Sequence, residues 1–279
     1  MQFSESPTQI RQDAVFVRSS VEQRDAFWRG KDLPSVEKAD LALNQILADL
    51  PSEETRRVLA NLELIHVQTN DILAEGGVPI SHCYFPLDAV VALVANLEEG
   101  ATVEVGLIGN EGMVGIRVIL GRSTGAYLAV VQIPGKCLRI KPDLLKAEFK
   151  RGGVLQDRLL QYVRYMLAQV SQTAACNRMH LLEQRLCRWL LSIQDRVKTA
   201  ELLITHEAIA HMLGATRSDV SRVVGALGKL GILHSSRGKT TILDRKALES
   251  TSCECYWIVR NDYIYPLRAR KASSGKGNL

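Results

Sequence analysis

The feature that most constrains the fold is a stretch of 22 residues, 154–175, that contains neither glycine nor proline. As an α-helix it would be about 33 Å long, because each residue adds about 1.5 Å. Its apolar residues form two stripes. The first consists of Leu155, Leu159, Tyr162 and Met166, and the second of Leu160, Val163, Leu167, Val170 and Ala174. A helix that docks only on its own domain needs one stripe.

We therefore expect the helix to pair with a second copy of the chain, as apolar helix faces do in coiled coils. Burial of both stripes within one chain is the alternative. Replacement of Leu159 and Met166 by Asp would test this dimer contact.

Residues 62–140, ahead of this helix, have the pattern of a β-domain. Apolar and β-branched runs alternate with turns rich in Gly, Asn, Asp and Pro at intervals of about ten residues. The clearest runs are 83–85, 89–95, 102–108 and 127–133. Short strands at this spacing predict a β-sandwich or small barrel. A short helix over 41–47 is expected to precede them.

Composition and charge restrict the class of protein. Of the 279 residues, 46% are hydrophobic and 23% are charged, as in globular proteins with an apolar core. The longest apolar run is far below the roughly 20 residues that span a bilayer, and the N-terminus lacks the features of a secretory signal. We therefore expect a cytoplasmic protein with no membrane contact. The net charge of +5 is compatible with an anionic partner.

Residues 203–227 have the pattern helix, tight turn, helix. Thr205 and Thr216 are suited to cap the two helices, and Gly214 supplies the turn between them. The inward residues of the second helix are predicted to be Val220, Val224 and Leu227. Its opposite face begins at Thr216 and carries Arg217, Ser218, Ser221 and Arg222. Helix-turn-helix units read bases with this part of the second helix, where hydroxyl and guanidinium groups reach the major groove.

A two-stranded wing is expected after the second helix, with its turn at Arg237-Gly238-Lys239. Arg237, Lys239 and Thr240 are suited to phosphate contacts, which position a protein on DNA without reading its sequence. Such a unit can also bind a protein, and this alternative stays open. Residues 200–250 hold seven basic and five acidic side chains, so the pattern favours DNA more than the charge does.

The order of these units over residues 41–250 resembles the Crp/Fnr family of transcription regulators. The family pattern Ala-x-x-Leu-Gly, followed by Thr-Arg and Ser-Arg, is matched by Ala210, Leu213-Gly214, Thr216-Arg217 and Ser221-Arg222. The resemblance implies a β-roll like a cyclic-nucleotide-binding domain, a long dimerisation helix and a winged helix-turn-helix, in that order. It also implies a homodimer that binds a two-fold-symmetric operator and adjusts the access of RNA polymerase.

One position departs from the family pattern. The family commonly has Glu after the first Arg of the recognition helix, where a carboxylate can accept a hydrogen bond from cytosine. This chain has Ser218 there, followed by Asp219. The operator sequence therefore does not follow from the resemblance.

A cyclic-nucleotide site is the effector site that the resemblance suggests first. Members that bind these ligands hold the ribose with Gly-Glu and the phosphate with a later Arg-Ser or Arg-Thr. Here Glu111 precedes Arg122-Ser123, but the order is Glu-Gly and the loop 121–125 is open and bounded by glycines. We interpret Glu111 and Arg122 as solvated loop charges, so the effector stays unknown.

The cysteines are at positions 83, 137, 176, 187, 253 and 255, and we expect them to be mostly reduced and buried. Iron–sulfur members of the family carry their cysteines near the N-terminus, unlike this chain. Cys253 and Cys255 supply two thiols, whereas a structural zinc needs about four ligands. We interpret the pair as a packing feature and predict no metal site and no cofactor. A thiol switch is the alternative.

Two patterns imitate enzyme motifs. His206-Glu207 and His211 resemble a zinc-protease helix, but histidines five residues apart diverge by about 140°. Gly238-Lys239-Thr240 resembles the end of a phosphate-binding loop, but Leu233 stands where that loop needs Gly. The sequence shows no nucleophile-elbow or dinucleotide signature. We therefore do not expect an enzyme.

Together these patterns predict an α+β chain in five parts. They are a flexible extension (1–40), a β-roll sensor-like domain (41–150), a dimerisation helix (151–177), a winged helix-turn-helix domain (178–250) and a tail (251–279). The expected function is sequence-specific DNA binding by a homodimer, modulated by an unidentified effector. A constitutive DNA-binding or protein-binding module without an effector is the alternative. Double-stranded DNA and RNA polymerase are the expected partners, and the direction of the effect on transcription is not predicted.

Overall fold

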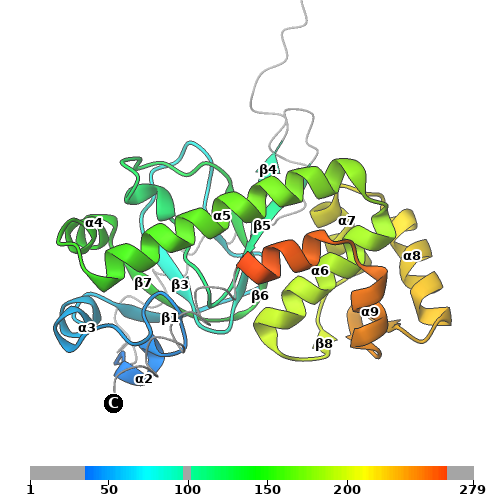
Figure 1. The fold of residues 1–279 in the computed structure, drawn as a ribbon, viewed down its shortest axis with the longest axis horizontal. Helices are drawn as coiled ribbons and strands as arrows, with labels where there is room; N and C mark the ends of the chain where they lie inside the picture. Colours follow the sequence, from blue (N-terminus) through cyan, green and yellow to red (C-terminus); the bar gives the residue numbers. More distant parts are fainter. Residues whose placement is uncertain (1–34, 97–101, 263–279) are drawn as a thin grey trace, which may run out of the picture.

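The computed structural model describes residues 35–96 and 102–262, so the predicted N-terminal extension lies almost entirely outside the described residues. Figure 1 shows a β-rich domain and a mainly helical domain, with one long helix running past both. This arrangement confirms the predicted α+β class. The boundaries between the domains remain predictions, because buried apolar residues of the β-domain and of the helical domain belong to one shared cluster.

Two antiparallel sheets form the β-domain. The first contains β1 (Glu63–Val67), β7 (Gly135–Ile140) and β3 (Cys83–Pro86), and the second β2 (Ile72–Ala74), β6 (Leu128–Ile133), β4 (Val90–Asn96) and β5 (Thr102–Ile108), in these orders. Side chains of both sheets share one buried cluster, which includes Ile65, Phe85, Val91, Val131 and Leu138. The four predicted strand runs are confirmed to within one residue at each end.

Helices α2 (Lys38–Leu41), α3 (Ser52–Leu59), α4 (Pro142–Lys150) and the 3-10 turn η1 (Ile116–Val118) complete this domain. The prediction of a helix over 41–47 is wrong, because residues 42–49 form turns. The cause is Asn44, whose buried amide donates to the carbonyl oxygens of Pro86 (2.9 Å) and Gly112 (3.0 Å). These hydrogen bonds attach residues 42–49 to the β-domain in a turn conformation instead of a helix.

The remainder of the chain is mainly helical. It consists of α5 (Val154–Met179), α6 (Leu182–Val197), β8 (Glu201–Leu202), α7 (His206–Leu213), α8 (Arg217–Lys229), β9 (Leu233–Ser236), β10 (Lys239–Ile242) and α9 (Arg245–Thr251). Residues 255–262, in the predicted tail, form a further helix that lies beside α5. An ion pair of 2.6 Å between Arg164 and Asp262 joins the two helices.

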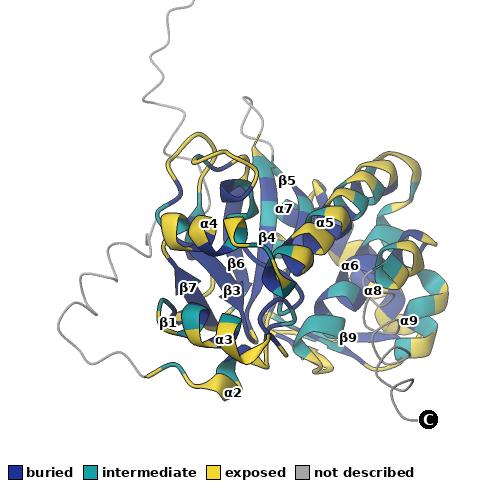
Figure 2. Ribbon diagram, turned by 60° about the vertical axis from the view of Figure 1, so that its left-hand side comes forward, coloured by how far each residue is buried: buried dark blue, intermediate teal, exposed yellow. Residues whose placement is uncertain are grey.

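Both predicted stripes of α5 are present, and they face different surroundings. The first packs into the β-domain, where Leu159 is fully buried and Met166 is 8% exposed. Leu160 and Leu167, in the second stripe, are 47% and 65% exposed, and Figure 2 shows the outer face of α5 open to solvent. Asp at positions 159 and 166 would therefore disrupt the fold of one chain. The proposed use of these two positions to test a dimer was wrong.

The second sheet is buried on both faces. Along β4, Val91 points into the β-domain core, whereas Val90, Ala92 and Val94 pack against the apolar face of α6. The centre of that contact is Trp189, which is fully buried. A strand that is covered on both sides reads as a continuous apolar run rather than an alternating one. This explains the run over residues 89–95 in the sequence.

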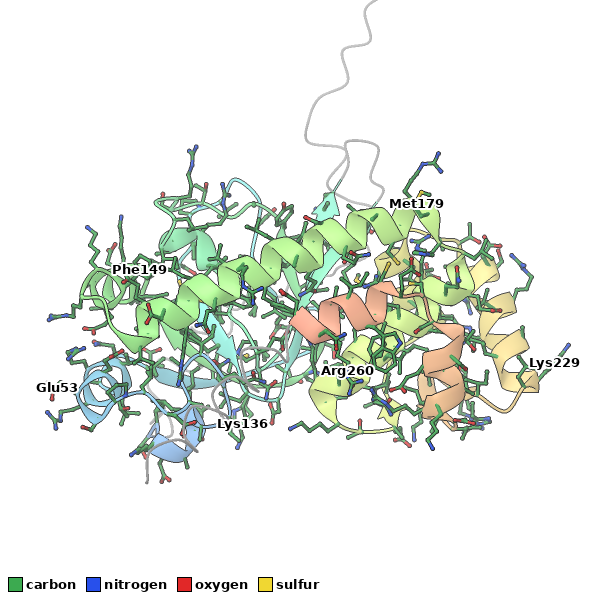
Figure 3. The ribbon with its side chains drawn as sticks, in the orientation of Figure 1. Glu53, Lys136, Phe149, Met179, Lys229 and Arg260 are labelled. Atoms are coloured by element: carbon green, nitrogen blue, oxygen red, sulfur yellow. The ribbon has the colours of Figure 1, made fainter. Side chains whose placement is uncertain are left out.

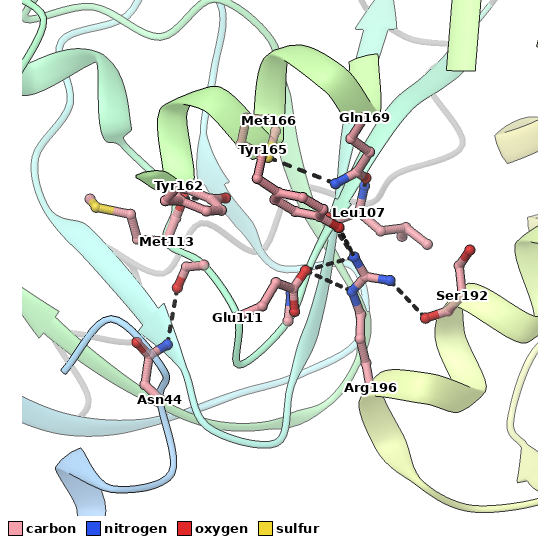
Figure 4. Close-up of polar contacts among 12 residues, drawn as sticks. Asn44, Leu107, Glu111, Met113, Tyr162, Tyr165, Met166, Gln169, Ser192 and Arg196 are labelled. Atoms are coloured by element: carbon pink, nitrogen blue, oxygen red, sulfur yellow. Dashed lines mark hydrogen bonds and ion pairs between the residues drawn. The ribbon is translucent and has the colours of Figure 1, made fainter. Parts of the chain in front are cut away.

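Polar contacts made by two side chains of α6 cross the same junction. The Trp189 indole N–H donates to Glu104 of β5 at 2.6 Å. Arg196 of α6 donates to Glu111 through Nε (2.9 Å) and Nη2 (2.6 Å), and Nη2 also contacts the Tyr165 hydroxyl at 3.1 Å (Figure 4). Glu111 is only 6% exposed. It is therefore a buried, paired carboxylate, and its interpretation as a solvated loop charge was wrong.

Side chains cover the surface of the helical domain out to Lys229, at the end of α8 farthest from the β-domain (Figure 3). Among the described residues, no helix combines the length and the apolar character that crossing a bilayer requires.

Replacement of Glu104 by Gln is expected to stabilise the protein above neutral pH. Burial raises the pKa of Glu104 from 4.5 to about 7. The folded chain therefore keeps a proton that the unfolded chain releases, so the stability linked to this group is full below pH 4.5 and is lost as the pH rises through about 7. The loss amounts to about 3 kcal/mol at most. Gln keeps an oxygen acceptor for Trp189 without the charge.

Chemical unfolding of the wild type and Glu104→Gln between about pH 5 and pH 8 measures this effect. We expect the variant to be the more stable protein at the upper pH and its stability to change less with pH. Replacement of the exposed Glu53, in α3, by Gln is the matched control. Equal pH dependence in all three proteins would contradict a buried, neutral Glu104.

Candidate nucleic-acid interface

Local hydrogen bonds define the helix-turn-helix. The Thr205 hydroxyl accepts from the backbone N–H of Ala208, and the Thr216 hydroxyl from that of Asp219, both at 3.1 Å. Each threonine thereby satisfies a backbone donor that the first turn of its helix leaves unpaired. Gly214 has φ +57° and ψ +46°, a left-handed conformation that ends α7 at low cost only for glycine. The predicted caps and turn are confirmed.

Helix α8 is anchored by one apolar face. Its predicted inward residues, Val220, Val224 and Leu227, are all buried, and they pack with Ala210 of α7 and Trp189 of α6. Ala210 allows the two helices to approach closely because its side chain is small. The opposite face of α8 is thereby held in a fixed orientation.

That opposite face carries the predicted base-reading residues. Thr216, Arg217, Ser218, Ser221 and Arg222 are all exposed. The Arg217 and Arg222 side chains are 74% and 75% exposed, so both guanidinium groups are accessible. Two turns of one helix therefore bring together two positive forks and three hydroxyl groups.

Asp219 organises the start of this face. One of its oxygens accepts from Arg222 at 2.8 Å, and the other accepts from the Thr216 hydroxyl at 2.7 Å. These hydrogen bonds lower the pKa of Asp219. Arg217 lies farther from its nearest carboxylate, with its Nε 3.9 Å from Glu207. The bond to Asp219 directs the Arg222 guanidinium along the helix.

A residue that the sequence did not single out for this interface, His206, connects the helix to the wing. Its Nδ1 lies 2.9 Å from the Ser221 hydroxyl, and its Nε2 lies 2.9 Å from the Ser235 hydroxyl on β9. Burial, together with the charge of Arg217, lowers the pKa of His206. A neutral imidazole at this position contacts both hydroxyl groups, and it thereby fixes the orientation of Ser221 relative to the wing. The only sequence signal was its place at the first position of α7.

Of the three predicted phosphate-binding residues of the wing, one is exposed at the tip of the turn. Arg237 and Gly238 form a tight turn with φ +48° and +79°, and Arg237 is exposed at its tip. Lys239 forms an ion pair of 2.6 Å with Glu201 of β8, which adds a third strand to the wing. Thr240 is fully buried between β8 and β9, so its expected phosphate contact is wrong.

A separate apolar cavity of about 200 Å³ lies between the second sheet and α5. Its lining includes Ile108, Ala129, Met166, Leu167 and Val170, and Arg117 is its charged member. The Arg117 guanidinium donates to the backbone oxygen of Thr124 at 3.0 Å. The structure does not bring Glu111 and Arg122 together at this cavity, since neither lines it.

Comparisons with known proteins agree with this geometry. Residues 184–251 match the family model described as the Crp-like helix-turn-helix domain. Transcriptional regulator SdrP of Thermus thermophilus is 26% identical over 196 residues, which are 67% of this chain and 93% of that protein. A global nitrogen regulator of Nostoc sp. is 24% identical over 60% of this chain and 78% of its own length.

Solved structures show the same fold. A transcriptional regulator of the CRP/FNR family from Thermus thermophilus has a TM-score of 0.55 at 24% identity, covering 68% of this chain and 98% of its own. FixK2 from Bradyrhizobium japonicum has a TM-score of 0.60 at 15% identity, covering 69% and 98%. SdrP and the CRP/FNR-family structure are described as transcriptional regulators and the Nostoc protein as a global nitrogen regulator, in agreement with the expectation that this chain is not an enzyme.

Proposed function

We propose that this chain, a transcriptional regulator of the Crp/Fnr family with a helix-turn-helix DNA-binding domain, binds a two-fold-symmetric operator as a homodimer. The observation that carries the proposal is the exposed row of hydroxyl and guanidinium groups on the first two turns of α8. Binding at an operator would place the protein beside RNA polymerase, its second proposed partner, in the cytoplasm.

Each residue of the interface has a chemical role in this proposal. Arg217 and Arg222 present forks that match the two acceptors of guanine, and Ser218 and Ser221 serve as shorter donors or acceptors in the major groove. Thr216 lies at the helix start, where its backbone and side chain can approach a phosphate. Arg237 extends the contact to the phosphate backbone beside the wing. Lys239 would make a second phosphate contact if its ammonium group left Glu201 and paired with a phosphate instead.

Helix α5 supplies the dimer surface. Its second stripe is apolar over several turns, and Leu160 and Leu167 are exposed by about half or more. Two such stripes packed together would remove apolar surface from water, which stabilises association by about 25 cal/mol per Å². Two recognition helices related by a two-fold axis along this contact must lie about 34 Å apart to enter successive major grooves.

The chemistry of the cavity lining limits the kind of effector that could bind there. Its lining is apolar, and Glu111, the carboxylate that would hold a ribose, is already bound to Arg196. We infer a small apolar effector rather than a cyclic nucleotide. Val163, Leu167 and Val170 belong both to the cavity and to the second stripe of α5, so a ligand here would touch the proposed dimer surface. The alternative is a constitutive DNA-binding module in which side chains of the second copy fill this space.

Arg222→Ala is expected to relax base recognition. Its affinity for the preferred operator should fall about 10- to 100-fold, while affinity for unrelated DNA changes little. Arg237→Ala should lower the affinity for the operator and for unrelated DNA by the same factor. It should also reduce the magnitude of the slope of log binding constant against log salt concentration by about one. Fluorescence anisotropy over a salt series measures these quantities. An unchanged ratio of specific to unspecific affinity in Arg222→Ala would refute its role in base readout.

Leu160→Asp combined with Leu167→Asp is expected to give monomers, because each charge would lie in the centre of an apolar contact. Sedimentation equilibrium measures the molecular mass directly. Leu43→Asp is the matched control, since Leu43 is 51% exposed but lies outside α5, and we expect it to remain dimeric. A dimeric double variant, or a monomeric wild type, would exclude α5 as the dimer surface.

Benzene, as a probe of the apolar cavity, is expected to raise the melting temperature of the wild type. Ala126 is exposed at the cavity lining, so Ala126→Leu should reduce this effect by occupying the space. Cyclic AMP should leave the melting temperature unchanged. A rise with cyclic AMP would contradict the apolar effector, and its loss in Arg122→Ala would place nucleotide binding at Arg122, outside this cavity.

A further inference from the structure

Four side chains that can bind metal meet where α5 ends: Cys176, His180, Cys253 and Cys255. Cys176 and His180 are one turn apart at the C-terminal end of α5. Cys253 and Cys255 follow α9, at the start of the last described helix. Each offers one ligand atom, and all four atoms lie within 4.8 Å of one another. In the sequence, only Cys253 and Cys255 are close enough to each other to suggest a site.

Two distances in this cluster are close to the edges of a tetrahedral zinc site. With Zn–S bonds of about 2.3 Å and Zn–N bonds of about 2.0 Å, two thiolates lie about 3.8 Å apart and a thiolate lies about 3.5 Å from an imidazole nitrogen. The Sγ atoms of Cys176 and Cys253 are 3.5 Å apart. The Sγ of Cys255 is 3.5 Å from Nδ1 of His180.

Neighbouring groups orient two of the ligands. Nε2 of His180 lies 3.3 Å from a carboxylate oxygen of Glu254, which leaves Nδ1 directed at the cysteines. The Gln172 side-chain amide donates to Cys255 Sγ at 3.1 Å. A carboxylate behind a ligating histidine and a donor on a ligating sulfur are typical of protein metal sites.

Burial and charge also fit a bound cation. The three cysteines form a small buried cluster of their own, each no more than 2% exposed. Three thiolates without a cation would be costly there, whereas with Zn²⁺ and a neutral imidazole the net charge is −1. The guanidinium of Arg188, 6% exposed, is close enough to act electrostatically on Cys176. Its Nε has no hydrogen-bond partner among the described residues.

We propose that Cys176, His180, Cys253 and Cys255 bind one structural Zn²⁺ ion. The protein fills all four positions of the tetrahedron, so the site is closed and serves stability rather than catalysis. Two ligands come from the last turn of α5 and its C-cap residue, and two from the segment after α9. The ion therefore cross-links the end of the long helix, directly before α6, to the segment that follows α9.

The test uses the full chain, purified with a reductant and without chelators. Elemental analysis should find one zinc per chain, and exchange with Co²⁺ should give the intense d–d absorption of tetrahedral cobalt together with thiolate charge-transfer bands. Cys255→Ser and His180→Ala should lose stoichiometric binding. Glu254→Gln, at an exposed carboxylate, should keep the site with an affinity lowered about tenfold. Cys187→Ala, at a buried cysteine in α6 outside the cluster, is the matched control and should bind as the wild type does.

Three results would overturn the proposal. The reduced wild type could fail to bind Zn²⁺ stoichiometrically or give the weak spectrum of octahedral Co²⁺, and this readout does not depend on whether any variant folds. Iron and sulfide in the purified protein would show that the cysteines hold a cluster instead. A Cys176–Cys253 disulfide in protein that takes up no metal would identify a thiol switch.

Discussion

A single helix with two apolar faces organises the chain. One face of α5 is buried in the β-domain through residues such as Leu159, and the other keeps Leu160 and Leu167 in water. An exposed leucine forgoes roughly 1.5–3 kcal/mol relative to a buried one, so an unpaired stripe of this kind is unfavourable. A second copy of the helix would cover it. The apolar cavity, the junction with the DNA-binding domain and the cysteine–histidine cluster all lie along this helix.

The second sheet links the cavity to the recognition helix. Ile108 and Ala129 line the cavity on the inner face, whereas Leu107 and Val130 pack on the outer face against the cluster that holds α6, α7 and α8. Because close-packed side chains transmit small displacements, a ligand that moved these strands would act on the DNA-binding domain without touching it. The docking at Trp189 thus supplies a physical connection between the two proposed functions, ligand binding and DNA recognition.

Periodicity and turn residues were enough to predict four strands of the β-domain, both stripes of α5, the caps of α7 and α8 and the exposed face of α8. These depend on contacts between near neighbours in the chain. Contacts between distant segments were not predictable in this way. Glu111 pairs with Arg196, His206 bridges to Ser235, and β8, a strand of two residues, buries Thr240. None of these pairings leaves a local pattern, because each depends on how the two domains or the strands of the wing meet.

In the proposed dimer, two α8 helices, held apart by paired α5 helices, read DNA together. Selection of bound sequences from a random duplex library by the purified full chain tests this arrangement most directly. We expect the enriched sites to consist of two inverted half-sites whose centres are about one helical turn, or 10 base pairs, apart. Enrichment of a single unpaired half-site, of sites with no symmetry, or of no sequence at all would contradict it.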